Sequence, residues 1–482
     1  FFYFLFSISF IFSQQKFHSS LSINNIFKEI KNFSEKKSIN NKSSLSLELN
    51  TDFISNSGHS NIDNAGELYS QGTFMEYYSL RFMYSNKWLS LDIEPYHKIN
   101  KDFFDNSYSL GTYQANNNHI YNKTYEGRKI GLKDSKIIIH YNGFGIGYGN
   151  MHHWWGPGFH SSIVLSPNAP SQETYLLGTI KDIKIGNFSF GSQIIAMPYK
   201  SSSNEQLYFS GLKTYLSHHS NSMKITAGIH RTYLSGDFST GNISSWSLLD
   251  AASLVIEPLF GQNKKDLDYT IPGTPGFDIW DEILSGYIKL VFPKINLEFY
   301  TEIASDDNRG NFTDLLAHWD HTLGYMIGFK KYAKINKLKM FYGLEYLSTK
   351  VSNTFNPNFY RGNEPDNFYA KPMYDFFTYE GRRLGAHSGS SSDDLVFIYG
   401  LDNGRNILFF SYNKERHGIK SKVYPELKSE VSLTFYHNFN KSHRAFMTIE
   451  YEKIDNFGFF ENNISISKLI WFGYSFSFNL EN

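Results

Sequence analysis

Residues 472–480 read FGYSFSFNL, and apolar side chains occupy every second position of this stretch. The apolar set consists of Phe472, Tyr474, Phe476, Phe478 and Leu480, and the small or polar set of Gly473, Ser475, Ser477 and Asn479. Because successive side chains of a β-strand point to opposite faces, this period of two predicts a strand. One face of that strand is apolar and the other is polar.

The same alternation recurs along most of the chain. It is found in residues 45–50, 89–94, 296–303, 342–346, 431–436 and 447–452, and the polar set repeatedly contains carboxylates. Polar, Gly-rich or Asn-rich breaks separate these segments. A soluble sandwich with a water-facing outer surface explains such alternation, and a transmembrane barrel with a polar lumen explains it as well.

Three observations favour the barrel. The strand pattern continues from Leu45 to the end without a domain-like shift in composition. Aromatic residues gather at strand ends, where a membrane barrel has its interfacial girdles. The stretch 472–480 resembles the aromatic-rich last strand of outer-membrane barrels, although Glu481 and Asn482 follow it. We therefore predict an all-β fold, a large transmembrane antiparallel β-barrel over residues 43–482.

The composition of the 482 residues agrees with this prediction and excludes several classes of protein. Aromatic residues make up 18% of the chain (44 Phe, 34 Tyr and 7 Trp), whereas ordinary cores are mainly aliphatic. Beyond the first dozen residues no apolar run approaches the roughly 20 residues of a membrane helix, which excludes a helical membrane bundle. The 46 basic residues equal the 46 acidic ones, so nucleic acid is not an expected partner. The lack of cysteine removes disulfides, thiolate metal sites and cysteine nucleophiles.

The first residues resemble a targeting signal. Residues 1–12 read FFYFLFSISFIF, an uncharged segment with the length of a signal-peptide apolar region. We interpret residues 1–13 as a truncated signal peptide that directs export; a buried strand or an N-terminal anchor is the alternative. Residues 17–42 are rich in Ser, Asn and Lys, with a weakly helical pattern between Ile23 and Ile30. Residues 14–42 are therefore expected to form a short helix or linker on the periplasmic side.

The most specific segment is WWGPG at residues 154–158. Gly156 and Gly158 permit positive φ and Pro157 fixes its own φ, so we predict a rigid turn that cannot continue a strand. The adjacent indoles of Trp154 and Trp155 could stack on the C–H faces of sugar rings. Alternatively, they belong to the interfacial girdle or plug the barrel by packing.

This segment resembles the signature of the capsule assembly protein Wzi family, in which W-G-P-G precedes a short Ser-rich apolar stretch and an Asn-Ala pair. Here residues 159–167 provide that stretch, and Asn168 with Ala169 provides the pair. Weaker resemblances cover residues 280–331 and the Gly-rich loop of residues 381–394. The segment ahead of the barrel is shorter than the helical segment that family members often carry.

The resemblance implies an outer-membrane barrel of about eighteen strands in a Gram-negative bacterium. Such a protein binds capsular or exopolysaccharide at the cell surface and assists capsule assembly or attachment. It implies a non-enzymatic protein whose partners are the polysaccharide and outer-membrane lipid, and we expect a monomer. A porin-like diffusion channel is the alternative, because the alternation does not tell whether the lumen is filled.

Arginines among aromatic residues are further candidates for polysaccharide binding. Arg361, Arg382 and Arg383 lie in a stretch rich in Tyr and Phe. Guanidinium groups recognise carboxylates bidentately, while aromatic rings stack on sugars. A charged outer loop or a lumen lining is the alternative.

No catalytic, cofactor or metal site is expected from the sequence. Adjacent His152 and His153 point to opposite faces of a strand, and no acidic residue or cysteine with ligand spacing lies nearby. Ser161 and Ser162 do not form the G-x-S-x-G elbow of a hydrolase.

Overall fold

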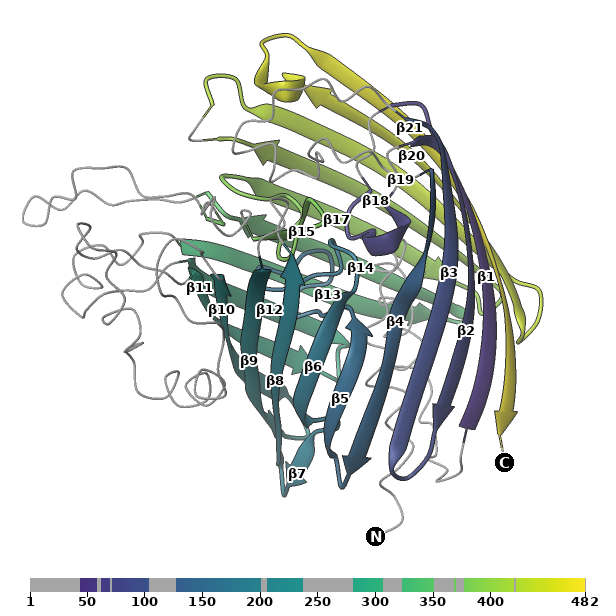
Figure 1. The fold of residues 1–482 in the computed structure, drawn as a ribbon. Coiled ribbons are helices and arrows are strands. Elements are labelled where there is room, and N and C mark those ends of the chain that lie inside the picture. Colours follow the sequence, from purple (N-terminus) through teal and green to yellow (C-terminus); the bar gives the residue numbers. More distant parts are fainter. Residues whose placement is uncertain are drawn as a thin grey trace, which may run out of the picture.

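The computed structural model describes residues 44–58, 62–69, 72–103, 127–200, 206–236, 281–306, 323–350, 368–369, 377–419 and 422–481. These residues form a closed antiparallel β-barrel of eighteen strands, as predicted (Figure 1). The strands of the barrel wall are β1 Ser44–Asn56, β2 Gly72–Ser85, β3 Leu89–Phe103, β4 Arg128–Tyr141, β5 Phe144–Met151, β6 Gln172–Thr179, β8 Phe188–Lys200, β9 Gln206–His219, β10 Lys224–Gly236, β11 Asp281–Phe292, β12 Leu297–Asp306, β13 Leu323–Ile335, β14 Leu338–Ser348, β17 Asp393–Asp402, β18 Asn406–His417, β19 Glu426–Asn438, β20 His443–Asp455 and β21 Ile464–Glu481.

The barrel closes because β1 pairs with β21 as well as with β2. The β1–β21 register runs from Ser44 opposite Glu481 to Asn56 opposite Leu469. The short strand β7 (Ile183–Ile185) pairs with β8 just beyond β6 and takes no separate place in the wall. Among the described residues, closure leaves each of the eighteen wall strands with a neighbour on both sides. The predicted signal peptide (1–13) and helix or linker (14–42) lie outside the described residues.

Side chains alternate between the two faces of the wall, as the period of two predicted. On β12 the outward-facing Phe299 and Ile303 are exposed, whereas Glu298 and Glu302, each directly preceding one of them, are buried in the lumen. On β21 the exposed Phe472 lies next to the buried Trp471. This arrangement gives lipid an apolar surface and keeps the carboxylates away from it. No helix among the described residues is long and apolar enough to cross a membrane.

The two ends of the barrel differ in their connections. Short hairpins such as residues 142–143, 336–337 and 403–405 join strands at the end where β1 begins and β21 finishes. In the first of these, Asn142 and Gly143 both have positive φ, at 47° and 85°, the geometry of a tight hairpin turn that matches strand twist. The connections at the opposite end are longer.

Three of the described loop segments from that opposite end pack into the lumen. The first lumen segment comprises residues 62–69, including the 3-10 turn η1 Gly66–Leu68. The second comprises residues 152–171 between β5 and β6, and the third comprises residues 377–392, with β15 Thr378–Tyr379 and β16 Arg382–Arg383. Their buried apolar side chains, with those of the inner wall, form the core of the molecule.

Candidate functional site

The WWGPG turn lies in the second lumen segment. The Trp155 amide donates a hydrogen bond to the Leu165 carbonyl at 3.0 Å, which closes the loop on itself. Gly156 has a φ of 155°, and a Cβ there would lie 2.8 Å from Glu302 Oε2 on the wall. A Cβ at Gly158 would lie 2.3 Å from the Ser161 carbonyl oxygen. The glycines are therefore required by the close approach of the turn to its surroundings.

The two indoles of the turn occupy different environments. Trp155 is 1% exposed, and its ring centroid lies 5.7 Å from that of His230 on β10. Trp154 is partly exposed, and its Nε1 donates to the Gly158 carbonyl at 3.1 Å. The position of Trp155 agrees with the alternative interpretation of packing inside the barrel. Direct stacking of either indole on sugars stays a prediction.

Glu345 on β14 attaches this segment to the wall. Its carboxylate accepts hydrogen bonds from the amides of Phe159 and Ser161, both at 2.7 Å, and from the Tyr300 hydroxyl at 2.6 Å. Hydrogen bonds to a charged acceptor are roughly twice as strong as neutral ones. The alternation around residues 342–346 placed Glu345 on the polar face, but no local pattern pointed to its partners.

His152 connects the first and second lumen segments to β4. Its Nε2 lies 3.2 Å from Glu67 in η1, and its Nδ1 lies 3.2 Å from Asp134. Asp134 is brought there by a bulge, because the β3–β4 register shifts between Asp92 and Glu94 and Asp134 has a φ of 46°. The carboxylates that sequence reasoning did not find beside His152 come from other strands and loops.

The electrostatics of this trio follow from its burial. Burial by itself opposes the charged form of His152, but Glu67 and Asp134 outweigh it and raise the pKa of His152 to about 10. Burial likewise opposes the charged form of Glu67, yet the imidazolium lowers the pKa of Glu67 to about 2. The neighbouring His153 has no such partner, and burial lowers its pKa to about 3. His152 and Glu67 are therefore both charged near neutral pH, whereas His153 is neutral.

Arg382 joins the third lumen segment to the other two. Its guanidinium donates to the carbonyls of Asn168 and Ile62, at 2.6 and 3.0 Å, and to Asn168 Oδ1 at 2.5 Å. It also lies 3.9 Å above the ring of Tyr69, a cation–π contact. Asn168, predicted from the motif alone, thus bridges two lumen segments.

The three predicted arginines are not together on an outer surface in the described structure. Arg382 and Arg383 are 1% and 0% exposed, and the Arg383 guanidinium lies 4.6 Å above the Tyr369 ring. Arg361 lies outside the described residues. Burial agrees with the lumen-lining alternative for Arg382 and Arg383, and a direct role in polysaccharide recognition stays a prediction.

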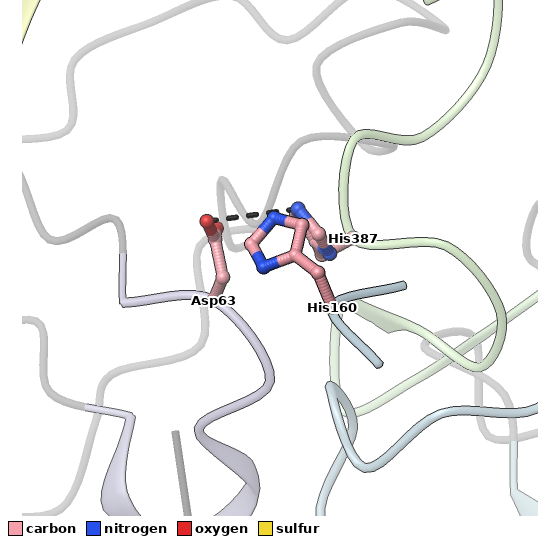
Figure 2. Close-up of side chains that lie close together, drawn as sticks. All are labelled: Asp63, His160 and His387. Atoms are coloured by element: carbon pink, nitrogen blue, oxygen red, sulfur yellow. Dashed lines mark ion pairs between the residues drawn. The ribbon is translucent and has the colours of Figure 1, made fainter. Parts of the chain in front are cut away.

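A small cavity of about 70 Å³ lies beside the first and second lumen segments. Asp63, His160 and Asn413 line it, together with lumen-facing residues of β18, β19 and β20. The side chains of Asp63, His160 and His387, one from each lumen segment, lie close together beside this cavity, and Figure 2 shows them pointing toward one another. Neither the histidines nor the aspartate were singled out as ligands from the sequence.

Comparisons with known proteins give a likeness of fold. No protein-family model matches the sequence, and no curated protein matches it. Among solved structures, the chain is similar to Wzi of Escherichia coli, described as an outer membrane protein involved in group 1 capsule assembly and a carbohydrate binding β-barrel. The TM-score is 0.57 at 11% identity, over 95% of this chain and 88% of that one.

Other solved structures also match, with lower scores. OccK3 (OpdO) of Pseudomonas aeruginosa has a TM-score of 0.43 at 10% identity, over 91% of this chain and 96% of that one. OccAB2 of Acinetobacter baumannii has a TM-score of 0.46 at 10% identity, over 90% of this chain and 98% of that one. The chain therefore shares its closed antiparallel barrel with Wzi, and at 11% identity the likeness is one of fold alone.

Proposed function

We propose that this protein is an outer-membrane barrel of a Gram-negative cell that binds capsular or exopolysaccharide at the cell surface and assists its attachment. The barrel is closed by its own loops and does not conduct solutes. The observation that carries this proposal is the filling of the lumen by three segments that bind one another and the wall through buried charged groups. The likeness to Wzi, a carbohydrate binding barrel, supports the choice of ligand.

The filled lumen weighs against the alternative of a diffusion channel. A channel needs a continuous aqueous path, whereas Arg382, Asn168 and His152 contact partners across the lumen while being buried. Their contacts are fully desolvated, and breaking a buried ion pair costs about 3 to 5 kcal/mol. The cavity of about 70 Å³ has room for only a few water molecules.

Polysaccharide binding would use the end of the barrel with long connections, which outer-membrane barrels turn outward. Of the predicted contacts, Trp154 is partly exposed in the described structure. We assign direct contact to Trp154 and Arg361, and we assign to the buried Trp155, Arg382 and Arg383 the role of holding the loops in shape. Sugar chains offer many repeat units, so weak single contacts add through effective concentration.

Two measurements test the proposal. The purified barrel in planar bilayers should show no steady conductance, and it should bind surface polysaccharide extracted from the source cells. Trp154→Ala should weaken that binding, and the effect should persist at high salt because stacking is not screened. Trp88→Ala is the matched control, since Trp88 is exposed on a hairpin at the opposite end. Steady conductance with no polymer binding would contradict the proposal and favour the channel.

A further inference from the structure

Four side chains from separate parts of the chain converge beside the cavity. His387 Nε2 lies 3.2 Å from Asp394 Oδ2 on β17 and 3.6 Å from Asp63 Oδ2. His160 Nε2 lies 3.4 Å from the same Asp394 oxygen. Figure 2 shows the imidazoles of His160 and His387 and the Asp63 carboxylate directed to a common point. Each lumen segment therefore contributes one side chain to this cluster, and strand β17 of the wall contributes the fourth.

His387 and Asp394 are the least well hydrogen-bonded members of this cluster. Among the described residues, the ring nitrogens of His387 and the carboxylate oxygens of Asp394 make no hydrogen bond of good geometry, and the closest contact between these two side chains is an ion pair of 3.2 Å. The side chains of His387 and Asp394 are 0% and 2% exposed. Because buried polar atoms are nearly always hydrogen-bonded, these atoms have bonding capacity left for a further partner.

The spacing of the donors fits a metal ion. Zinc lies about 2.0 to 2.2 Å from histidine nitrogen and carboxylate oxygen, so the ligands of a tetrahedral site are about 3.3 Å apart. Three of the six separations among the four residues, 3.2, 3.4 and 3.6 Å, agree with that edge length, and one ligand atom from each of Asp63, His160 and His387 lies within 4.8 Å of the other two. Imidazole with carboxylate suits zinc and related transition metals, whereas calcium prefers oxygen donors alone.

The charges of the cluster also fit a divalent cation. Asp63 and Asp394 carry two negative charges, which an ion of charge two balances. The nearby Glu415 is already paired with Lys428 at 2.7 Å and with His417 at 2.9 Å. Lys428 also lies 3.0 Å from Asp63, so this lysine competes for that carboxylate. His160 Nε2 lies 3.1 Å from Asn413 Nδ2, a contact that ion binding would replace.

We propose that Asp63, His160, His387 and Asp394 form a binding site for one divalent transition-metal ion, with zinc as the best-fitting ion. The sequence alone predicted no metal site, because the four proposed ligands lie in four separate segments and do not show the short spacing of a metal-binding motif. A bound ion would join all three lumen segments to β17 at one point. It would therefore act as a structural clamp on the lumen filling, independently of which polymer the surface binds.

The test is a zinc titration of the full-length barrel in detergent after treatment with EDTA and its removal. Isothermal titration calorimetry should give one zinc ion per chain, and calcium should not compete. His160→Gln and His387→Gln should each weaken binding by about 10- to 100-fold or more, since even partners of metal ligands contribute that much. His219→Gln is the control for adventitious binding, because His218 and His219 form an adjacent pair near the β9–β10 hairpin.

A second readout protects the test against misfolded variants. Heat-modifiable migration reports whether each variant is a folded barrel. Zinc should raise the unfolding temperature of the wild-type barrel and of His219→Gln. At the zinc concentration that just saturates the wild type, zinc should raise the unfolding temperature of folded His387→Gln or Asp394→Asn much less than that of the wild type. Absence of saturable zinc binding by the folded wild type, or unchanged binding in a folded His160→Gln/His387→Gln double variant, would overturn the proposal.

Discussion

Replacing Glu345 by glutamine is expected to loosen the second lumen segment without changing its shape. One carboxylate oxygen accepts from the Phe159 amide and the Tyr300 hydroxyl, and the other accepts from the Ser161 amide. Glutamine has one oxygen and one NH₂ group. In either orientation of the amide, the NH₂ group faces a backbone N–H, and at least one buried donor loses its acceptor.

The size of the effect follows from these contacts. A hydrogen bond to a charged group contributes about 1.5 to 3 kcal/mol, and an unsatisfied buried donor costs about 1 to 3 kcal/mol. Removing the charge lowers the desolvation cost of the side chain and offsets part of this loss. We expect a net cost of about 2 to 3 kcal/mol. The ratio of molecules whose second lumen segment is detached from the wall to molecules in which it is bound should therefore rise about 30- to 150-fold.

Conductance in planar bilayers and urea unfolding in detergent measure the two consequences. Glu345→Gln should show transient openings that the wild type lacks, together with a lower free energy of unfolding. Glu173→Gln is the matched control, because it removes the same charge from an exposed carboxylate that accepts from the Tyr148 hydroxyl at 3.0 Å. If Glu345→Gln and the wild type have equal unfolding free energies and equally silent bilayers, the anchoring role of Glu345 is refuted.

Three further predictions concern the trio, the lipid face and the arginines. The pKa of His152 is raised to about 10 from about 6.5 in the unfolded chain. The contribution of His152 to stability is therefore complete below about pH 6.5 and lost as the pH rises through about 10. The free energy of unfolding, measured in urea, should fall over that range more for the wild type than for His152→Gln. Phe476→Arg places a charge on the lipid side and should lower the free energy of unfolding by about 2 to 4 kcal/mol near the bilayer midplane. Ser475→Arg places the charge on the lumen side and should lower it less. Equal losses in unfolding titrations would show that the two faces of the strand are misassigned. Arg382→Lys should destabilise the barrel almost as much as Arg382→Gln, because lysine cannot make the forked contacts with Asn168. Since these contacts are buried, the loss of stability should not depend on salt. A lysine variant as stable as the wild type would contradict this role of the Arg382 guanidinium.

The sequence by itself determined the wall of the barrel. The period of two in stretches such as 472–480 predicted the strands, the antiparallel barrel and the face of each side chain. It could do so because every strand residue meets either lipid or the lumen, and this choice is made locally, one position at a time. Glu345 and Glu302 were visible as carboxylates on the polar face for the same reason.

Only the tertiary structure decided what fills the lumen. Phe159 and Glu345 are 186 positions apart, and Arg382 and Asn168 are 214 positions apart. The WWGPG motif predicted a rigid turn but not that the turn folds inward, where Trp155 is buried. The histidine and aspartate cluster is likewise assembled from three loops and one strand. A loop that enters a lumen takes its partners from strands all around the barrel, and no local periodicity encodes which side chains will meet at its centre.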